Sequence, residues 1–305
     1  MSARQLGGRS ETDENYGGAD IPVCPTMGQA RMPVPPSLIF MGKVKALASQ
    51  KPIKLIGTDF DLTLHYQGIS KAVQDLLIET IHKGVKVGIV SGRPWYDLRT
   101  LLTQYGINFG KPYPNYLVWR EKFILWVEDG KTHEEVEWNQ LKMREMEALN
   151  LEILKAAPGW LAALKAAGLS HKIWNIFGEY GFEVFYATPE EAEKARVILA
   201  DLAGRLPNAE VSRNYWGTNV TLASGSKGCA LRHVGDCLGL APDEVLAIGD
   251  SLNDLSMLDG RCGLRAACVG NADPVVKEAV RKNGGLVAEK SGGEGVAEII
   301  MKLVS

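Results

Sequence analysis

The sequence has few cysteines, no long apolar segment and no excess of basic charge, and each absence excludes a class of protein. Five cysteines occur in 305 residues. No C-x-x-C pair and no histidine at zinc spacing accompanies them, which argues against a disulfide framework or a cysteine-based zinc site. The longest apolar stretches, such as residues 85–90, are far shorter than the ~20 residues that span a bilayer.

Charge of one sign is also missing, since 34 Lys and Arg stand against 36 Asp and Glu. This balance disfavours binding to nucleic acid or to an acidic membrane as the main role. Cys229 and Cys237 lie in an apolar helical pattern that is typical of small buried side chains. We therefore expect a cytoplasmic protein with reduced cysteines, monomeric or homodimeric, with neither nucleic acid nor membrane as a partner.

The chain divides into three patterns. Residues 1–50 are punctuated by Gly and Pro without sustained periodicity, which predicts a mobile tail. From residue 51 short apolar runs alternate with amphipathic segments, as they do again near the C-terminus, and this rhythm is typical of a parallel sheet covered by helices. We expect an α/β fold: a doubly wound, Rossmann-like parallel-sheet core (51–110 and 217–305) with an inserted α+β cap domain (111–216).

The expected elements follow from these periodicities. In the flanking stretches we predict strands at 53–58, 85–90, 245–248 and 265–269, and helices at 70–83, 94–105, 226–238, 252–258, 274–282 and 295–303. In the insertion we predict strands at 116–119, 123–127, 172–177, 182–186 and 218–222, and helices at 138–156, 159–167 and 189–202.

An acidic motif follows the first strand. The segment 54–64 reads KLIGTDFDLTL, so Asp59, Asp61 and Thr63 come directly after a buried strand. Ligands of open α/β sheets bind beyond the carboxyl ends of the strands. Because Asp59 and Asp61 project to the same side, their carboxylates repel unless a cation lies between them, and Mg²⁺ suits oxygen ligands. The alternative is an Asx-type turn or a helix cap.

Three further polar segments occupy comparable places. VGIVSGR ends a second strand in Ser91 and Gly92, where a hydroxyl and backbone N–H groups suit a phosphate oxygen. SGSKGCAL puts Lys227 in the first turn of a helix, where the helix dipole disfavours a cation, so another use is indicated. VLAIGDSLNDLSM ends a strand in Asp250, with Asn253 and Asp254 close behind. Each has an ordinary interpretation as a turn, cap or solvated lysine, but their joint occurrence in this order is improbable by chance.

Together these residues resemble the four ordered motifs of the haloacid dehalogenase superfamily of phosphatases. The resemblance spans about 53–303. The insertion between the second and third motifs is similar to that of the subclass with a large α/β cap, which includes sucrose-phosphate phosphatases and related sugar phosphatases. Two departures bear on the sugar: many members have Gly where this chain has Leu62, and an acidic residue where it has Asn219.

The resemblance implies roles for the motif residues. Asp59 would be the nucleophile and Asp61 the general acid and base, with Mg²⁺ held by Asp59, Asp250 and the backbone carbonyl of Asp61. It implies that the phosphoryl group is bound by Ser91, Gly92, Lys227 and Asn253, and that Thr63 and Asp254 support the site. The candidates for cap residues that contact the substrate, given with the preferred one first, are Lys172, His171, Trp119, Arg120 and Trp216.

The function we expect is therefore Mg²⁺-dependent hydrolysis of a small phosphomonoester, a sugar phosphate above others, through an aspartyl-phosphate. One alternative is a sugar phosphomutase, which returns the phosphoryl group to the sugar. Another is a catalytically silent sugar-phosphate-binding protein, which the presence of Asp59, Asp61 and Asp250 disfavours.

Overall fold

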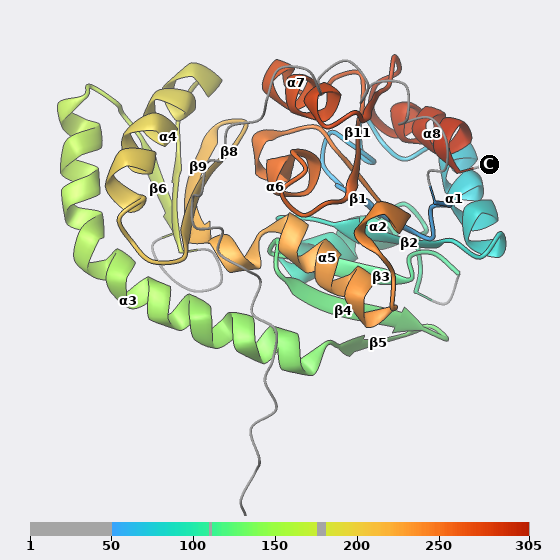
Figure 1. Ribbon diagram of the computed structural model, residues 1–305. Helices are drawn as coiled ribbons and strands as arrows, with labels where there is room; N and C mark the ends of the chain where they lie inside the picture. Colours follow the sequence, from blue (N-terminus) through green and yellow to red (C-terminus); the bar gives the residue numbers. More distant parts are fainter. Residues whose placement is uncertain (1–50, 110–111, 176–180, 305) are drawn as a thin grey trace, which may run out of the picture. The chain divides into compact units, whose positions relative to one another are not determined.

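A computed structural model describes residues 51–109, 112–175 and 181–304, with the backbone alone for 173–175. The described chain contains two sheets (Figure 1). The larger has eight strands in the order β12-β11-β10-β1-β2-β3-β4-β5, parallel from β12 to β3 and antiparallel from β3 to β5. Its strands are β1 (Leu55–Thr58), β2 (Lys86–Val90), β3 (Tyr116–Trp119), β4 (Phe123–Glu128), β5 (Lys131–Glu134), β10 (Val245–Gly249), β11 (Arg265–Cys268) and β12 (Leu286–Val287).

Helices cover both faces of the large sheet, because its parallel strands are apolar on both sides. Leu55 and Ile56 are neighbours on β1, yet they belong to two different buried clusters, as the two-residue period of a strand requires. One face carries α1 (Lys71–His82), α2 (Trp95–Gln104) and α8 (Gly292–Leu303), and the other carries α5 (Lys227–Cys237), α6 (Leu255–Leu258) and α7 (Pro274–Lys282). Helices α1 and α8 lie side by side (Figure 1).

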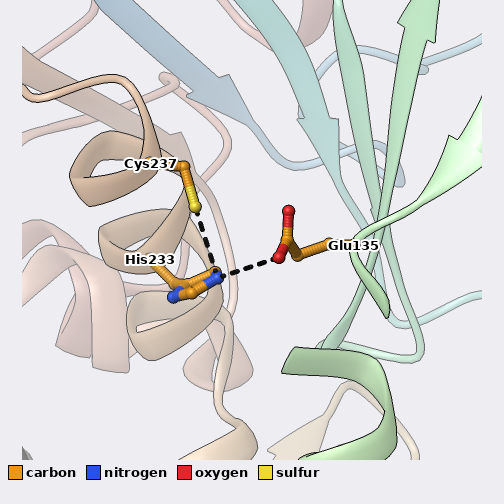
Figure 2. Close-up of side chains that lie close together, drawn as sticks. All are labelled: Glu135, His233 and Cys237. Atoms are coloured by element: carbon orange, nitrogen blue, oxygen red, sulfur yellow. Dashed lines mark hydrogen bonds and ion pairs between the residues drawn. The ribbon is translucent and has the colours of Figure 1, made fainter. Parts of the chain in front are cut away.

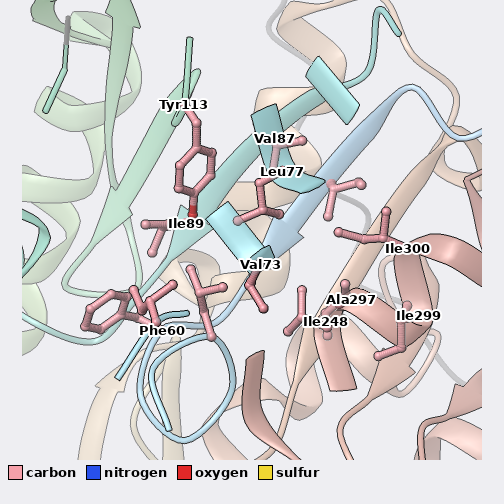
Figure 3. Close-up of a cluster of buried hydrophobic side chains, with 14 of the residues drawn as sticks. Phe60, Val73, Leu77, Val87, Ile89, Tyr113, Ile248, Ala297, Ile299 and Ile300 are labelled. Carbon is pink, nitrogen blue, oxygen red and sulfur yellow. The ribbon is translucent and has the colours of Figure 1, made fainter. Parts of the chain in front are cut away.

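The buried cluster beneath α1 and α8 is shown in Figure 3. Leu77 of α1 and Ile89 of β2 are fully buried in it, together with Ile248 of β10. Full burial of such a side chain contributes about 1.5–3 kcal/mol, whereas an exposed ion pair contributes about 0–1 kcal/mol. Apolar packing therefore holds the strand ends that carry the polar motifs.

The smaller sheet is antiparallel, in the order β6-β7-β9-β8, and one of its faces packs against two helices. Thr188 and Glu191 form a capping box at the start of α4. The elements are α3 (Val136–Ala166), β6 (Lys172–Asn175), β7 (Phe182–Phe185), α4 (Pro189–Ala203), β8 (Ala209–Asn214) and β9 (Gly217–Leu222).

Helix α3 differs from the sequence prediction of two helices, 138–156 and 159–167, because it runs through Pro158 without a break. Pro158 is exposed on the helix surface. The buried stripe continues past it at helical spacing, so packing against the sheet outweighs the hydrogen bond that proline cannot donate. The stripe is formed by Met146, Leu149, Ile153, Ala157, Trp160 and Leu164.

Sheet membership also differs from the prediction. Strands β3, β4 and β5 extend the large sheet although they fall within 111–216, whereas β9 pairs in the small sheet, as expected for the strand at 218–222 that was assigned to the insertion. Patterns in one sequence do not show which strands pair, and a hairpin adds to a sheet edge as readily as it begins a new sheet. The boundaries of core and cap stay predictions, and the expected tail at 1–50 lies outside the described residues. Among the described helices, none is long and apolar enough to cross a membrane.

Candidate active site

The polar motifs meet at one edge of the large sheet. Asp59 follows β1, Ser91 follows β2 and Asp250 follows β10. These three strands are adjacent and parallel in the order β10-β1-β2, so their carboxyl ends lie together. Lys227, the first residue of α5, completes the group from the neighbouring helix.

Lys227 links two carboxylates of this site. Its Nζ donates to Asp59 Oδ1 and to Asp254 Oδ1, each at 2.6 Å, and its side chain is only 1% exposed. The second oxygen of Asp254 accepts from the backbone N–H groups of Asp250 (2.9 Å) and Ser251 (3.0 Å). Asp254 is thus engaged through both oxygens, which suits the supporting role expected of it.

The carboxylates of the site repel one another. Burial and the charge of Asp254 raise the pKa of Asp59 well above its usual range, although Lys227 lowers it. Burial, with Asp254 next, raises the pKa of Asp250 to about 7, while the hydrogen bond from Thr63 Oγ1 (2.7 Å) lowers it. Burial lowers the pKa of Lys227, but Asp254 and Asp59 outweigh this and raise it, so the ammonium stays charged.

This donor set fits a divalent cation. One ligand oxygen from each of Asp59, Asp250 and Asp254 lies within 4.8 Å of the others, and all three residues are buried. Because Lys227 and two backbone N–H groups already engage Asp254, Asp59 and Asp250 are the side chains that suit direct contact with the ion. Burial first, and then repulsion between the carboxylates, raises the pKa of Asp59 and of Asp250, and a bound cation would offset the repulsion. Carboxylate oxygens are the ligands of hard cations such as Mg²⁺.

Asp61 lies at the rim of the site and faces Arg93. The guanidinium donates to both carboxylate oxygens, from Nε at 2.6 Å and from Nη2 at 2.7 Å, and Asp61 is 38% exposed. Such two-pronged contacts between Arg and carboxylate are among the strong charge-assisted hydrogen bonds. For Asp61 to hold a proton, Arg93 must release one of its oxygens.

The residues expected to bind the phosphoryl group lie close to Glu121, a residue that the sequence motifs did not indicate. Ser91 is buried, and its Oγ accepts from Arg93 N at 3.1 Å. Asn253 Nδ2 donates to Glu121 Oε1 at 2.9 Å. A side-chain carbon placed on Gly92 would come within 3.4 Å of that same oxygen. Glu121 follows β3, the strand next to β2, so its place at the sheet edge is the one signal that would have indicated it.

The departure at position 62 has a backbone consequence. Leu62 has φ +61°, a left-handed conformation that favours glycine. The turn is held by its own hydrogen bonds, since Leu62 N donates to His65 O (2.9 Å) and Leu62 O accepts from Asn271 Nδ2 (2.8 Å). The strained conformation is thus retained between Asp61 and Thr63, the two polar residues it positions.

Two of the five proposed cap contacts belong to the large sheet instead. Trp119 ends β3 and packs against Phe123 in a tilted arrangement with ring centroids 4.7 Å apart, and Arg120 follows it in the turn to β4. Their place in the large sheet follows from the pairing of β3 with β2, and their contact with the substrate stays a prediction. His171 precedes β6 and packs against Tyr186, and Trp216 lies half-exposed in the turn between β8 and β9.

The face of the small sheet that turns away from its helices is polar. Ser212, Asn219 and Glu183 are direct neighbours across β8, β9 and β7, and Lys172 of β6 lies on the same face opposite Phe185. Among the described residues, Ser212 Oγ and Asn219 Oδ1 are buried without a hydrogen-bond partner. This face therefore offers unused hydrogen-bonding groups.

Glu183 connects this polar face to the strand-end site. Burial raises its pKa to about 7, with opposing contributions from Arg120 and Lys122 and a further rise from Glu121. The same Glu121 carboxylate also raises the pKa of Lys227. The turn after β3 therefore lies near both Glu183 and Lys227, and the charge of Glu121 in this turn acts on both side chains.

The sequence expectation for the cysteines is wrong at Cys237. Its side chain is exposed rather than buried, and a histidine does lie at metal-binding spacing from it. Cys237 Sγ and His233 Nε2 are 3.4 Å apart, one turn of α5 from each other. Zinc spacings sought along the sequence do not include this pair, because it forms only when both residues occupy one helix face.

Comparisons with known proteins find hydrolases and phosphatases that are similar to this chain. A family model described as haloacid dehalogenase-like hydrolase matches residues 170–300. The chain is 27% identical over 257 residues to a phosphoglycolate phosphatase of Sulfolobus acidocaldarius, covering 83% of this chain and 97% of that protein. It is 27% identical over 283 residues to a putative phosphatase of Streptococcus pyogenes, with 83% and 98% covered.

Among solved structures, the chain is similar to the sucrose-phosphatase from Synechocystis in complex with sucrose and phosphate. The TM-score is 0.61 at 17% identity, and the match covers 83% of this chain and 98% of that one. At this identity the likeness concerns the fold alone. It confirms the expected α/β class, a doubly wound core with an inserted cap.

Proposed function

The chain belongs to the haloacid dehalogenase superfamily and is a phosphatase, and from that premise we propose that it is a Mg²⁺-dependent hydrolase of a small phosphomonoester, a sugar phosphate above others. The observation that carries the proposal is the buried contact of Lys227 with Asp59 and Asp254, beside Asp250. A lysine and carboxylates confined together at strand ends suit a phosphoryl group and a cation. If the contacts of Lys227 only stabilised the fold, the further carboxylate of Asp250 beside them would not be needed.

In this proposal Asp59 is the nucleophile. One carboxylate oxygen attacks phosphorus, the bond to the leaving alcohol oxygen breaks, and an aspartyl-phosphate forms that water then hydrolyses. The attack needs the ionised carboxylate, which the contact with Lys227 favours. Mg²⁺, held by Asp59, Asp250 and the backbone carbonyl of Asp61, would offset the charge on the transferring group.

Asp61 is proposed to donate a proton to the leaving alcohol and then to accept one from the attacking water. Its two hydrogen bonds from Arg93 affect its roles as general acid and as general base differently. With both oxygens bonded to Arg93, the carboxylate suits the second role. For the first, one oxygen must leave Arg93 and carry the proton.

Ser91, Gly92, Lys227 and Asn253 are proposed to hold the phosphoryl oxygens, with Thr63 and Asp254 supporting the site. The Asn253 amide donates to Glu121. A phosphoryl oxygen would take the place of the Glu121 carboxylate on that donor. Glu121 must therefore move aside when substrate binds.

The polar face of the small sheet is proposed to contact the leaving group, with Lys172, Glu183, Asn219 and Ser212 as the contacts. Buried hydrogen-bonding groups without partners match a ligand that is rich in hydroxyls.

We also propose that the protein acts in the cytoplasm, as a monomer or homodimer and without nucleic acid. The cysteines of the described chain are free thiols, which suits a reducing compartment.

The test is inorganic phosphate release from a panel of sugar phosphates, phosphoglycolate and simple phosphomonoesters, with Mg²⁺ or with a chelator. The purified full-length protein is compared with Asp59→Asn and with Asp75→Asn, a matched control on the exposed surface of α1. We expect release that needs Mg²⁺, favours sugar phosphates and is lost only in Asp59→Asn. Release that survives in Asp59→Asn would contradict the proposal, and transfer between positions of one sugar without release would indicate the mutase.

A further inference from the structure

Figure 2 shows a second group of side chains that could ligate a metal ion, namely Glu135, His233 and Cys237. His233 and Cys237 are on α5, and Glu135 lies between β5 and α3. Lys227 begins the same helix, so the rise of an α-helix puts this group about 9–15 Å further along its axis. It shares no residue with the proposed catalytic site.

The ligand atoms of this group are close enough to bind one ion. Cys237 Sγ lies 3.4 Å from His233 Nε2, and Glu135 Oε1 lies 3.9 Å from the same nitrogen. All three ligand atoms are within 4.8 Å of one another. Bonds of about 2.0–2.3 Å to a tetrahedral ion place ligand atoms about 3.3–3.6 Å apart, so small side-chain shifts suffice.

Neighbouring tryptophans hold two of these side chains. Trp126 Nε1 donates to Glu135 Oε2 at 2.8 Å, which leaves Oε1 directed at His233. Trp138 stacks on the His233 ring at 4.3 Å and 20°. Orientation of ligands by such outer contacts is typical of metal sites.

Binding of an ion requires the neutral imidazole of His233 and the thiolate of Cys237. The Cys237 thiol would lose its proton to solvent when an ion binds, as cysteine ligands do.

We propose that Glu135, His233 and Cys237 bind a transition-metal dication of the Zn²⁺ class, with water as the fourth ligand. Imidazole and thiolate suit this class of ion, whereas Mg²⁺ prefers oxygen ligands throughout. The bound ion joins α5, which carries Lys227, to the start of α3. It therefore stabilises the folded chain without entering the phosphoryl-transfer site.

The experiment uses Co²⁺ as the probe, added to the reduced full-length protein in excess Mg²⁺ so that the Asp59 and Asp250 site is occupied. We expect one Co²⁺ per chain with cobalt–thiolate charge-transfer absorption. This absorption disappears in Cys237→Ser and His233→Ala, and Zn²⁺ displaces it in the wild type. The matched controls Cys229→Ser, on the same helix, and His133→Ala, on β5, keep it.

Absence of the absorption in the wild type, or its persistence in Cys237→Ser, would overturn the proposal. Trp126→Phe removes the hydrogen bond to Glu135 and should weaken Co²⁺ binding on the order of 10- to 100-fold. Equal affinity in that variant would contradict ligation by Glu135.

A second measurement guards against variants that unfold. Zn²⁺, again in excess Mg²⁺, should raise the thermal unfolding temperature of the wild type and leave that of His233→Ala unchanged. Circular dichroism before heating shows whether His233→Ala is folded. An equal rise in both proteins would overturn the proposal.

Discussion

Lys227 and the aspartates around it illustrate how one buried charge depends on others. Two carboxylates lie 2.6 Å from its Nζ, and burial leaves no solvent to stabilise any of the three groups. Removal of one member of a buried ion pair leaves its partner uncompensated and costs about 3–5 kcal/mol. The residue therefore has a part in both stability and proposed catalysis.

We predict that Lys227→Met lowers phosphate release by about 10²- to 10³-fold, the usual loss when one group that stabilises transition-state charge is removed. Methionine keeps much of the side-chain length but cannot offset the charge of Asp59 and Asp254. Steady-state phosphate release with saturating Mg²⁺ measures the effect. Lys83→Met, an exposed change at the end of α1, is the control. Activity of Lys227→Met within a few-fold of wild type would contradict the assigned role.

At this scale the sequence predicted which strand ends lie together, but not which side chains contact each other there. Asp59, Ser91 and Asp250 follow directly from apolar strands whose carboxyl ends share an edge, so the strand pattern alone was enough to infer their proximity. The hydrogen bonds that Arg93 donates to Asp61 and that Asn253 donates to Glu121 could not be inferred in this way, because they depend on side-chain directions and on the pairing of β3 with β2.

Among the elements, α3 shows packing outweighing local propensity. Pro158 and Gly159 together indicate a helix end in the sequence, yet the helix continues because both residues are exposed while the buried stripe runs on. A glycine inside a helix still costs backbone entropy. A Cβ at position 159 would meet nothing within 4 Å.

We predict that Gly159→Ala raises the free energy of unfolding by about 0.5–1 kcal/mol, measured by urea denaturation. The matched control is Gly181→Ala, where φ is +86° and a Cβ would lie 2.3 Å from Val220 O. That variant should be less stable than wild type. A loss of stability in Gly159→Ala would show that the helix is interrupted at Pro158.

The small sheet makes a prediction about pH through Glu183. Burial raises its pKa to about 7 in the folded chain, from an ordinary value of 4.5. A carboxyl whose pKa is raised by folding stabilises the fold while protonated. Its contribution is complete below the unfolded pKa and is lost as pH rises through about 7.

Between about pH 5 and pH 8 the wild type should therefore lose stability relative to Glu183→Gln, by at most on the order of 3 kcal/mol. Glutamine keeps the shape and hydrogen-bonding capacity but cannot ionise. Denaturant unfolding of both proteins across this range, at constant ionic strength, makes the comparison. Parallel stability curves would show that Glu183 ionises as freely when folded as when unfolded.

For the molecule as a whole, fold class was more predictable than strand pairing. Alternating apolar runs and amphipathic segments identify a doubly wound sheet, because parallel strands need apolar residues on both faces. The three missed strands were β5, whose four residues are all exposed, β8, whose side chains are mostly polar or part-buried, and β12, which has two residues. These three strands form because they pair with neighbouring strands, and their own sequences lack the hydrophobic pattern that would predict them.

The central claim is that the site at the end of β1 transfers a phosphoryl group to Asp59. Its most direct test is rapid acid quenching of the full-length protein during turnover of its best substrate with Mg²⁺, followed by mass spectrometry of the peptides. The account predicts a phosphoryl group on the Asp59 carboxylate, absent when Mg²⁺ is chelated. Phosphate release without any phosphorylated Asp59, under conditions that preserve an acyl phosphate, would contradict it.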